Sequence, residues 1–375
     1  MPKFRNLFAS VLFCALASAA SAQWIKQNVN TTASFRGLAV VNEKIVWASG
    51  TGGTVVRTID GGKTWNVITV PGSEKLDFRD IEAFDANTAY ILSIGNGESS
   101  RIYKTVDGGK TWQLEFQNTN EKAFFDAIAC FDRESCFAMS DPVDGKFLLI
   151  KRSPEVKSRV GIRLSKWVPI DNSALTAKPG EAAFAASGTC LITQGTNNLF
   201  LVTGGMAARV FRSNDRGATW SVADTPVVHG TSGSGIFSIA MFDEKNGVIV
   251  GGNYEKPPEN TANLAFTRNG GKSWNLGEGL RGYRSGVTYV DQKKIIAVGT
   301  SGTDFSTDEG KSWHFSDSKV GDTTDTKQGR MTLLIGDANL NSVQAKGKNV
   351  VWSVGPNGFI GHHVDLTSLI KLNPF

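Results

Sequence analysis

The octapeptide Thr58-Ile59-Asp60-Gly61-Gly62-Lys63-Thr64-Trp65 decides the fold, because four near copies follow it along the chain. The copies run from Thr105 to Trp112, from Ser213 to Trp220, from Thr267 to Trp274 and from Ser306 to Trp313. A short unit that recurs at intervals of this size indicates a repeat architecture. We therefore expect one supersecondary unit to be repeated through the molecule.

The residue types of the octapeptide predict a tight turn between two strands. An aspartate in third place accepts hydrogen bonds from its own turn, and a glycine in fifth place allows a positive φ. A hydroxyl in seventh place closes the turn, and the final tryptophan carries a large apolar surface into the core. Turn chemistry thus gives the copies a structural role. Their key residues are Asp60 and Trp65, Asp107 and Trp112, Asp215 and Trp220, Asn269 and Trp274, and Asp308 and Trp313.

The spacing of the copies predicts seven units. The gap from Asp107 to Asp215 is about twice the gap from Asp60 to Asp107, so one copy is missing between them. Its expected remains are Lys151-Arg152-Ser153-Pro154 and Lys166-Trp167, separated by an insertion. The innermost strands of the seven units are predicted to begin near Phe35, Phe78, Phe124, Ala182, Ile236, Tyr283 and Asn341.

The two ends of the chain predict how the repeats close. In the last unit Val351-Trp352-Ser353-Val354-Gly355 mirrors Val46-Trp47-Ala48-Ser49-Gly50 in the first, but no octapeptide follows it. Trp24-Ile25-Lys26-Gln27 resembles the strand after an octapeptide and would supply the missing outer strand, which leaves no open sheet edge. The prediction is an all-β, seven-bladed β-propeller over residues 23–375, closed by an N-terminal strand in the last blade.

The octapeptide resembles the Asp-box, or BNR repeat, of sialidase-like β-propellers. The whole pattern is similar to the photosystem II stability/assembly factor family, whose members are exported or lumenal seven-bladed propellers with Asp-box turns. The segments Asp141–Phe147 and Gly180–Thr189 look like those of uncharacterised secreted bacterial relatives of that family. The resemblance implies structural Asp-boxes on one face and partner contacts on the other, where the innermost strands begin.

The N-terminus has the pattern of a secretory signal peptide over residues 1–22. Lys3 and Arg5 precede an apolar run from Leu7 to Ala17, and Ala20-Ser21-Ala22 is a small-residue cleavage site. We expect an exported protein, periplasmic or extracellular, without membrane insertion because no later apolar run has the length of a membrane span. Removing Lys3 and Arg5 lowers the formal net charge from +5 to +3, too mild an excess for a nucleic-acid binder.

Three cysteines follow the predicted signal peptide. Cys130 and Cys136 flank a predicted hairpin loop, and export permits a disulfide between them that leaves Cys190 free. The alternative is that all three are small buried hydrophobic residues. Three cysteines without a neighbouring histidine form no zinc pattern, and no dinucleotide fingerprint is present. No metal or cofactor is therefore expected.

Candidate contact residues lie where the innermost strands begin. Three of these strands open with an aromatic residue and an arginine, namely Phe35-Arg36, Phe78-Arg79 and Tyr283-Arg284, and Asp126 opens another. Arginines fixed at strand ends are suited to recognise carboxylate or phosphate. Alternatively, they pair with carboxylates of neighbouring blades and lock the ring.

Two loops on the same face add further candidates. Asp141 and Asp144 bracket a turn that offers too few oxygens for a calcium site, so a plain turn is the competing interpretation. The long loop from Asn253 to Asn263 carries Tyr254 and Glu255, and long loops are often functional. Disorder is the alternative for this loop.

Two functions fit the sequence. The first is a monomeric, non-enzymatic scaffold that binds a protein partner, as an exported assembly or quality-control factor. The second is a sialidase-like or other glycoside hydrolase with a carbohydrate ligand, in which Arg36, Arg79 and Arg284 would form an arginine triad. Arg36-Gly37-Leu38 stands where sialidases have Arg-Ile-Pro, and other glycosidases need two facing carboxylates. This departure favours the binding function.

Overall fold

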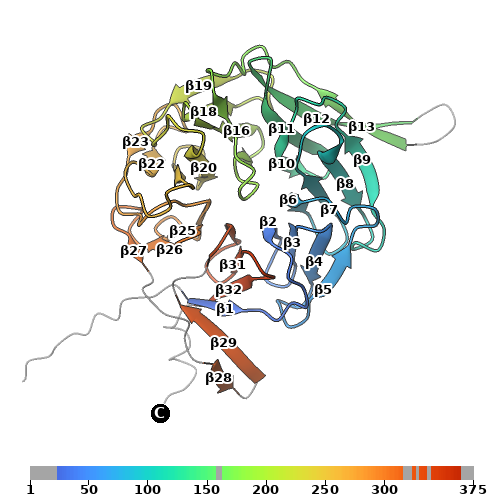
Figure 1. The fold of residues 1–375 in the computed structure, drawn as a ribbon, viewed down its shortest axis with the longest axis vertical. Coiled ribbons are helices and arrows are strands. Elements are labelled where there is room, and N and C mark those ends of the chain that lie inside the picture. The colour runs from blue at the N-terminus through green and yellow to red at the C-terminus, as the bar shows by residue number, and fades with distance from the viewer. Residues whose placement is uncertain (1–22, 158–162, 316–322, 327–328, 336–338, 365–375) are drawn as a thin grey trace, which may run out of the picture.

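A computed structural model of the chain describes residues 23–157, 163–315, 323–326, 329–335 and 339–364. Seven antiparallel sheets are arranged as blades around a central axis, which confirms the predicted seven-bladed β-propeller (Figure 1). The predicted signal peptide at 1–22 lies outside the described residues. Within the described ranges the one helix is the short η1 (Gly97–Ser99), and no helix there has the length and hydropathy to cross a membrane.

The first three blades each contain four strands, given from the axis outward. Blade 1 consists of β2 (Phe35–Val40), β3 (Val46–Gly50), β4 (Thr54–Thr58) and β5 (Asn66–Thr69). Blade 2 consists of β6 (Phe78–Ala83), β7 (Ala89–Ser93), β8 (Arg101–Thr105) and β9 (Gln113–Gln117). Blade 3 consists of β10 (Phe125–Asp132), β11 (Ser135–Val143), β12 (Lys146–Lys157) and β13 (Arg163–Pro169).

Blades 4 to 6 follow the same order. Blade 4 consists of β15 (Leu191–Gln194), β16 (Asn198–Val202), β18 (Arg209–Ser213) and β19 (Ser221–Asp224). Blade 5 consists of β20 (Ser234–Met241), β21 (Gly247–Asn253), β22 (Leu264–Thr267) and β23 (Asn275–Leu276), and its sheet also takes in β14 (Glu181–Ala182) and β17 (Gly204–Gly205). Blade 6 consists of β24 (Gly286–Tyr289), β25 (Ile295–Gly299), β26 (Gly302–Ser306) and β27 (His314–Phe315).

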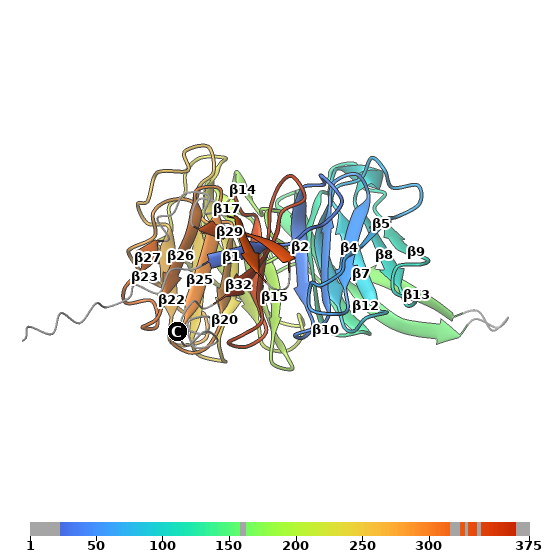
Figure 2. The same cartoon turned by 90° about the horizontal axis from the view of Figure 1, so that it is seen from below.

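Blade 7 joins the two ends of the chain. It contains β30 (Ser342–Ala345), β31 (Val351–Val354), β32 (Ile360–Val364) and, from the N-terminus, β1 (Gln23–Lys26). As predicted, β1 pairs antiparallel with β32, with Trp24 opposite His363. The other edge of β1 pairs with β29 (Gly329–Ile335), which forms a hairpin with β28 (Thr323–Thr326), and Figure 2 shows β1 between β29 and β32. The sequence did not predict this added hairpin.

The predicted starts of the innermost strands are correct to within about two residues in five blades. They are wrong in blades 4 and 6, where the strands begin at Leu191 and Gly286 rather than near Ala182 and Tyr283. In blade 4 the reason is that Ala182 pairs with Gly204, in the sheet of the next blade. The residues that follow, 183–190, run through the centre of the ring before the strand starts, and we call them the channel segment.

Each Asp-box is a turn held by two side chains. In the first, Asp60 Oδ1 accepts the Thr64 N–H at 2.9 Å and Oδ2 accepts the Thr64 hydroxyl at 2.6 Å. Thr58 donates its hydroxyl to Asp60 at 2.8 Å and accepts the Gly62 N–H at 2.9 Å. The other aspartate boxes repeat these bonds, whereas in the fourth Asn269 donates its amide N–H to the Ser273 hydroxyl at 2.8 Å.

The box glycines allow each blade that carries an Asp-box to pack closely against the blade before it. Gly62 has a φ of 87°, and a Cβ there would lie 2.6 Å from the ring of Trp352 in blade 7. A Cβ at Gly109 would meet Ile68 of blade 1 at 2.6 Å, and one at Gly271 would meet Phe200 of blade 4 at 3.0 Å. Glycine is therefore required twice, by the backbone conformation and by the close approach of the neighbouring blade.

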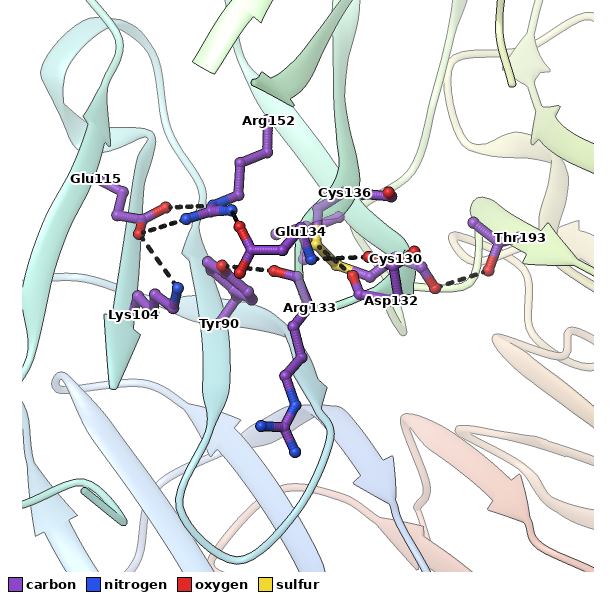
Figure 3. The surroundings of a disulfide bond; sticks show 12 residues. Tyr90, Lys104, Glu115, Cys130, Asp132, Arg133, Glu134, Cys136, Arg152 and Thr193 are labelled. Atoms are coloured by element: carbon purple, nitrogen blue, oxygen red, sulfur yellow. Dashed lines mark hydrogen bonds and ion pairs between the residues drawn. A yellow bond between two sulfur atoms is a disulfide. The ribbon is translucent and has the colours of Figure 1, made fainter. Parts of the chain in front are cut away.

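Blade 3 lacks the box, as the spacing predicted, and an ion-pair cluster joins it to blade 2 instead (Figure 3). Arg152 of β12 is 3% exposed, and its Nε donates to Glu115 of β9 at 3.1 Å while Nη1 pairs with Glu134. Trp167 packs edge-on against Tyr90 of blade 2 at 6.4 Å, much as Trp65 packs against Trp352 across the first blade boundary. In blade 3 the ion pairs of Arg152 thus take the place of the Asp-box in the contact with blade 2.

The structure contains a disulfide between Cys130 and Cys136. The two residues lie directly opposite each other on β10 and β11, with Cα atoms 4.0 Å apart, and Figure 3 shows the bond beside the turn that carries Glu134. Cys190 is a buried free thiol. The bridge therefore ties the two strands of blade 3 that lie nearest the axis.

We expect Trp24→Ala to destabilise the protein by about 3–5 kcal/mol, the range for removing a large aromatic side chain from a core. Trp24 is fully buried, and its Nε1 donates to the Thr303 hydroxyl of blade 6 at 3.0 Å. The free energy of unfolding in urea measures the loss. Lys26→Ala, at an exposed position near the end of the same strand, is the matched control, and equal effects of the two substitutions would contradict the role of Trp24 in closure.

The Asp-boxes make stability depend on acid pH. Hydrogen bonds from the hydroxyl and N–H of Thr64, the largest of them from the hydroxyl, lower the pKa of Asp60 to about 2, and the pKa values of Asp107 and Asp308 are also about 2. Because an unfolded aspartate titrates near 4, this stabilisation is complete above about pH 4 and is lost as the pH falls toward 2.

Asp60→Asn should therefore make the fall in melting temperature between pH 4 and pH 2 shallower than in the wild type, since the natural Asn269 box shows that an amide can hold the turn. Thermal unfolding at a series of pH values measures both slopes. Equal slopes would mean that the boxes do not carry the acid dependence.

Candidate functional site

A cavity of about 450 Å³ opens at the channel mouth, the face on which the innermost strands begin. Strand order places this face opposite the Asp-boxes, because the boxes follow the third strand of each blade and successive strands reverse direction. Side chains of several blades converge on it. The cavity is lined by Arg36, Arg79, Phe124, Asp126, Asp141, Ala182, Ala183, Phe184, Ala185, Ala186, Phe237, Tyr254, Tyr283, Ser285, Thr300 and Asn341.

The channel segment forms the floor of this cavity. Its residues exchange hydrogen bonds with every blade other than their own, so they lie on the axis of the ring. The partners are Arg36 of blade 1, Arg79 of blade 2, Asp141 of blade 3, Ser238 and Ile239 of blade 5, Ser285 at the start of blade 6 and Ser342 of blade 7. Nothing in the periodicity of the sequence predicted this course.

Two arginines stand side by side at the mouth. Arg36 Nη1 donates to the Ala186 carbonyl at 3.0 Å, and Arg79 Nη1 donates to the Ala185 carbonyl at 3.2 Å. Arg79 Nε also pairs with Asp77 at 2.7 Å. Burial, followed by the charge of Arg79, lowers the pKa of the Arg36 guanidinium. Each arginine keeps N–H groups that no described residue accepts, so both can take a ligand oxygen.

Arg284 does not reach the mouth, and the prediction that it lines this face with the other two arginines is wrong. Its side chain is fully buried, Nε donates to Asp304 at 2.8 Å, and Nη1 donates to the Ser301 hydroxyl at 2.8 Å. Arg284 therefore follows the alternative interpretation, an arginine that pairs with a carboxylate and locks its blade. Among the described residues the sialidase-like arginine triad is not assembled.

Two carboxyl groups face the arginines from blade 3. Asp126 on β10 is 1% exposed, and its Oδ2 has no hydrogen-bond partner among the described residues. Asp141 on β11 accepts the Ala183 N–H at 2.7 Å. Burial, and then the charge of Asp141, raises the pKa of Asp126 well above its usual range, and burial raises the pKa of Asp141 to about 6.

An aromatic wall completes the cavity. Phe184 of the channel segment stacks on Phe237 of β20 with ring centroids 3.9 Å apart and planes 4° apart. Tyr283 meets the same Phe237 edge-on at 4.7 Å. Tyr254 packs edge-on against both phenylalanines and remains 47% exposed. The cavity thus has a cationic side, an acidic side and an apolar side.

The remaining predicted contact residues lie outside this cavity. Asp144 has a φ of 50° and pairs with Lys122 at 2.9 Å, an exposed contact in a plain turn. Glu255 donates its N–H to Asn253 Oδ1 at 3.0 Å and does not line the cavity. In the described part of the chain no group of three or more histidine, cysteine, aspartate or glutamate side chains is suited to hold a metal ion.

A buried aspartate beneath the channel segment was missed by sequence reasoning. Asp80 accepts the Ile81 N–H at 2.8 Å and the Ile128 N–H at 2.7 Å, and burial raises its pKa to about 8. Gly188, with a φ of 77°, packs directly against this carboxyl group. Gly188 could have indicated this close packing from the sequence, because a glycine inside an expected strand often marks a close approach of the backbone to another group.

Comparison with known proteins finds one matching family model and a set of solved structures with the same fold. A family model described as "Photosynthesis system II assembly factor YCF48" matches residues 16–114, which include the first two Asp-boxes. No curated protein matches the chain. Over these residues the chain is similar to that family. This confirms the resemblance that the repeats indicated.

Solved structures with the same fold cover nearly the whole chain. One described as "YCF48 bound to D1 peptide" is 16% identical, with a TM-score of 0.62 over 91% of this chain and 96% of that one. "YCF48 from Cyanidioschyzon merolae" is 15% identical, with a TM-score of 0.63 over 91% and 99%. The WD40 propeller domain of Doa1 is 10% identical, with a TM-score of 0.53 over 94% and 99%. At these identities the likeness concerns the fold.

We expect Gly188→Ala to destabilise the protein more than Gly195→Ala. Both glycines have a positive φ, of 77° and 60°, so each substitution incurs backbone strain of about 1–2 kcal/mol. A Cβ at Gly188 would also collide with Asp80, whereas one at Gly195 would meet nothing within 4 Å. Urea unfolding of both variants measures the difference, and equal losses would show that the channel segment is not packed against Asp80.

Proposed function

We propose that the chain is an exported, non-enzymatic propeller that binds a peptide segment of a protein partner at the channel mouth. The observation that carries the proposal is the pairing of Arg36 and Arg79 in one cavity with an aromatic wall. Each guanidinium is fixed by a carbonyl of the channel segment and keeps donors for a ligand. Arginines and aromatic rings are the residue types that dominate binding energy at protein interfaces.

The comparisons support a protein partner. The propeller of the same fold described as "YCF48 bound to D1 peptide" holds a peptide, and the family model concerns an assembly factor. We infer from them the class of ligand, a peptide; the sequence of that peptide is to be determined by experiment. Export is supported by the signal-peptide pattern of residues 1–22 and by the compatibility of the Cys130–Cys136 disulfide with an oxidising compartment.

The binding test uses peptides of defined chemistry. Short peptides with free C-termini are selected from a random display library on the purified protein and then titrated by calorimetry. We expect Arg36→Ala and Arg79→Ala each to weaken binding by about 2 kcal/mol or more, roughly thirtyfold in Kd, because each removes a fixed, partly desolvated donor group.

The matched control is Arg133→Ala, in the turn between β10 and β11 on the opposite face, which should bind the selected peptides as the wild type does. Unchanged affinity in both mouth variants would place the contact elsewhere. Hydrolysis of a fluorogenic sialoside by the wild type, lost in Asp126→Asn, would overturn the non-enzymatic part of the proposal.

A further inference from the structure

We propose that Asp126 and Asp141 form a cation subsite that takes the ammonium or guanidinium group of a basic side chain in the bound peptide. The inference rests on the proposed function and deepens it, because it names a chemical requirement for the partner. It concerns the acidic side of the cavity, whereas the proposed function rests on the arginines.

The first argument is that Asp126, unlike three other buried acids of the ring, forms no ion pair with a described residue. Glu181 of β14 accepts the Arg209 Nε–H at 2.9 Å, and Asp304 of β26 pairs with Arg284. Glu115 pairs with Arg152, and Asp80 accepts two backbone N–H groups. Each of these acids is paired with an arginine or accepts two backbone N–H groups, although Asp304 Oδ1, like Asp126 Oδ2, has no hydrogen-bond partner among the described residues.

The backbone N–H groups of Asp141 and Ala185 lower the pKa of Asp126, but one of its oxygens has no partner of its own. Its side chain is 1% exposed and borders the cavity, yet Oδ2 meets no donor among the described residues. A buried polar atom without a partner costs about 1–3 kcal/mol, more when it is charged. An acid in this position, in the wall of an open cavity, is suited to a partner that arrives with the ligand.

The arginines of the cavity do not supply that partner. Arg79 is engaged by Asp77 and by the Ala185 carbonyl, and Arg36 by the Ala186 carbonyl. No ion pair within 4.0 Å joins either arginine to Asp126 or Asp141 in the described part of the chain. The charge of Arg79 lowers the pKa of Asp126, but no ion pair closes the acidic side of the cavity, so a ligand can engage both sides at once.

The aromatic wall fits the same kind of ligand. The stem of a lysine or arginine is apolar and packs well on ring faces, and its charged end is attracted to aromatic rings. Phe184 and Phe237 form one stacked surface, and Tyr254 closes over it from the long loop with almost half of its side chain exposed. A basic side chain can therefore lie on the wall with its charge directed to the carboxyl pair.

Proton release is a second quantity by which the cation subsite can be measured. The titratable groups that line the cavity with the pair are Arg36, Arg79, Tyr254 and Tyr283, and the charges of Asp126 and Asp141 also reach the buried thiol of Cys190. Because burial raises the pKa values of both Asp126 and Asp141, and a bound cation favours their ionised forms, cation binding is coupled to proton release from the pair. A divalent metal ion is a poorer fit, since two carboxyl groups fall short of the oxygen ligands that calcium requires.

The test compares two synthetic peptide mixtures that differ at one fixed central position, lysine in one and norleucine in the other, with all other positions randomised. Norleucine keeps the length and apolar stem of lysine but has no charge. We expect the lysine mixture to bind the wild type at least about thirtyfold more tightly, the effect of removing one partner of a buried charge pair. Calorimetry in two buffers of different ionisation enthalpy should show proton release with the lysine mixture alone.

Substitutions of the two aspartates test the same interaction from the side of the protein. Asp126→Asn and Asp141→Asn should each remove the preference for lysine, measured within each variant as the ratio of its affinities for the two mixtures. Circular dichroism spectra like that of the wild type show that the variants are folded. Asp144→Asn, an exposed neighbour of the same blade, is the matched control and should keep the preference.

The outcomes separate the two proposals. Equal binding of both mixtures, lost in Arg36→Ala, would overturn the cation subsite and leave the peptide-binding function standing. A lysine preference that survives Asp126→Asn and Asp141→Asn would also overturn it, because the charge would be recognised elsewhere. Failure of both mixtures to bind would contradict the proposed function itself.

Discussion

At five of the seven blade boundaries the packing depends on the contact between an Asp-box glycine and the blade before it. The turn places two consecutive residues at positive φ, and the second is a glycine in all five boxes. At Gly62 this allows the backbone to rest on Trp352, a residue from the other end of the sequence. A local turn thereby sets the distance between blades, and the repeated distance determines that the ring closes.

The central site exists because one blade departs from this regularity. Blade 4 begins its innermost strand late, and the residues before it fill the axis of the ring instead. The carbonyls of Ala185 and Ala186 then fix the two arginines, and the N–H of Ala183 fixes Asp141. One segment thus orients both charged sides of the cavity while Phe184 contributes its apolar side.

The sequence could predict the features that depend on contacts between residues close together in the chain. The turn-forming side chains of each box find their hydrogen-bond partners within eight positions, and Trp24 repeats the pattern of a box tryptophan, so the fold and its closure could be predicted. Arg284 was misplaced because its partner, Asp304, lies on another strand, and one sequence does not show which carboxylate a given arginine meets. The course of the channel segment was missed because its hydrogen bonds go to other blades.

The position of β1 in blade 7 bears on how the chain reaches its native state. The first described strand pairs with residues 361–364, so its partners are synthesised only after the other six blades. Forming that contact requires closing a loop that contains those six blades, a step of high contact order and low rate. Until then the indole of Trp24 has no core to pack into and one edge of β32 is unpaired, and exposed apolar surface with an open strand edge makes such a chain prone to aggregation.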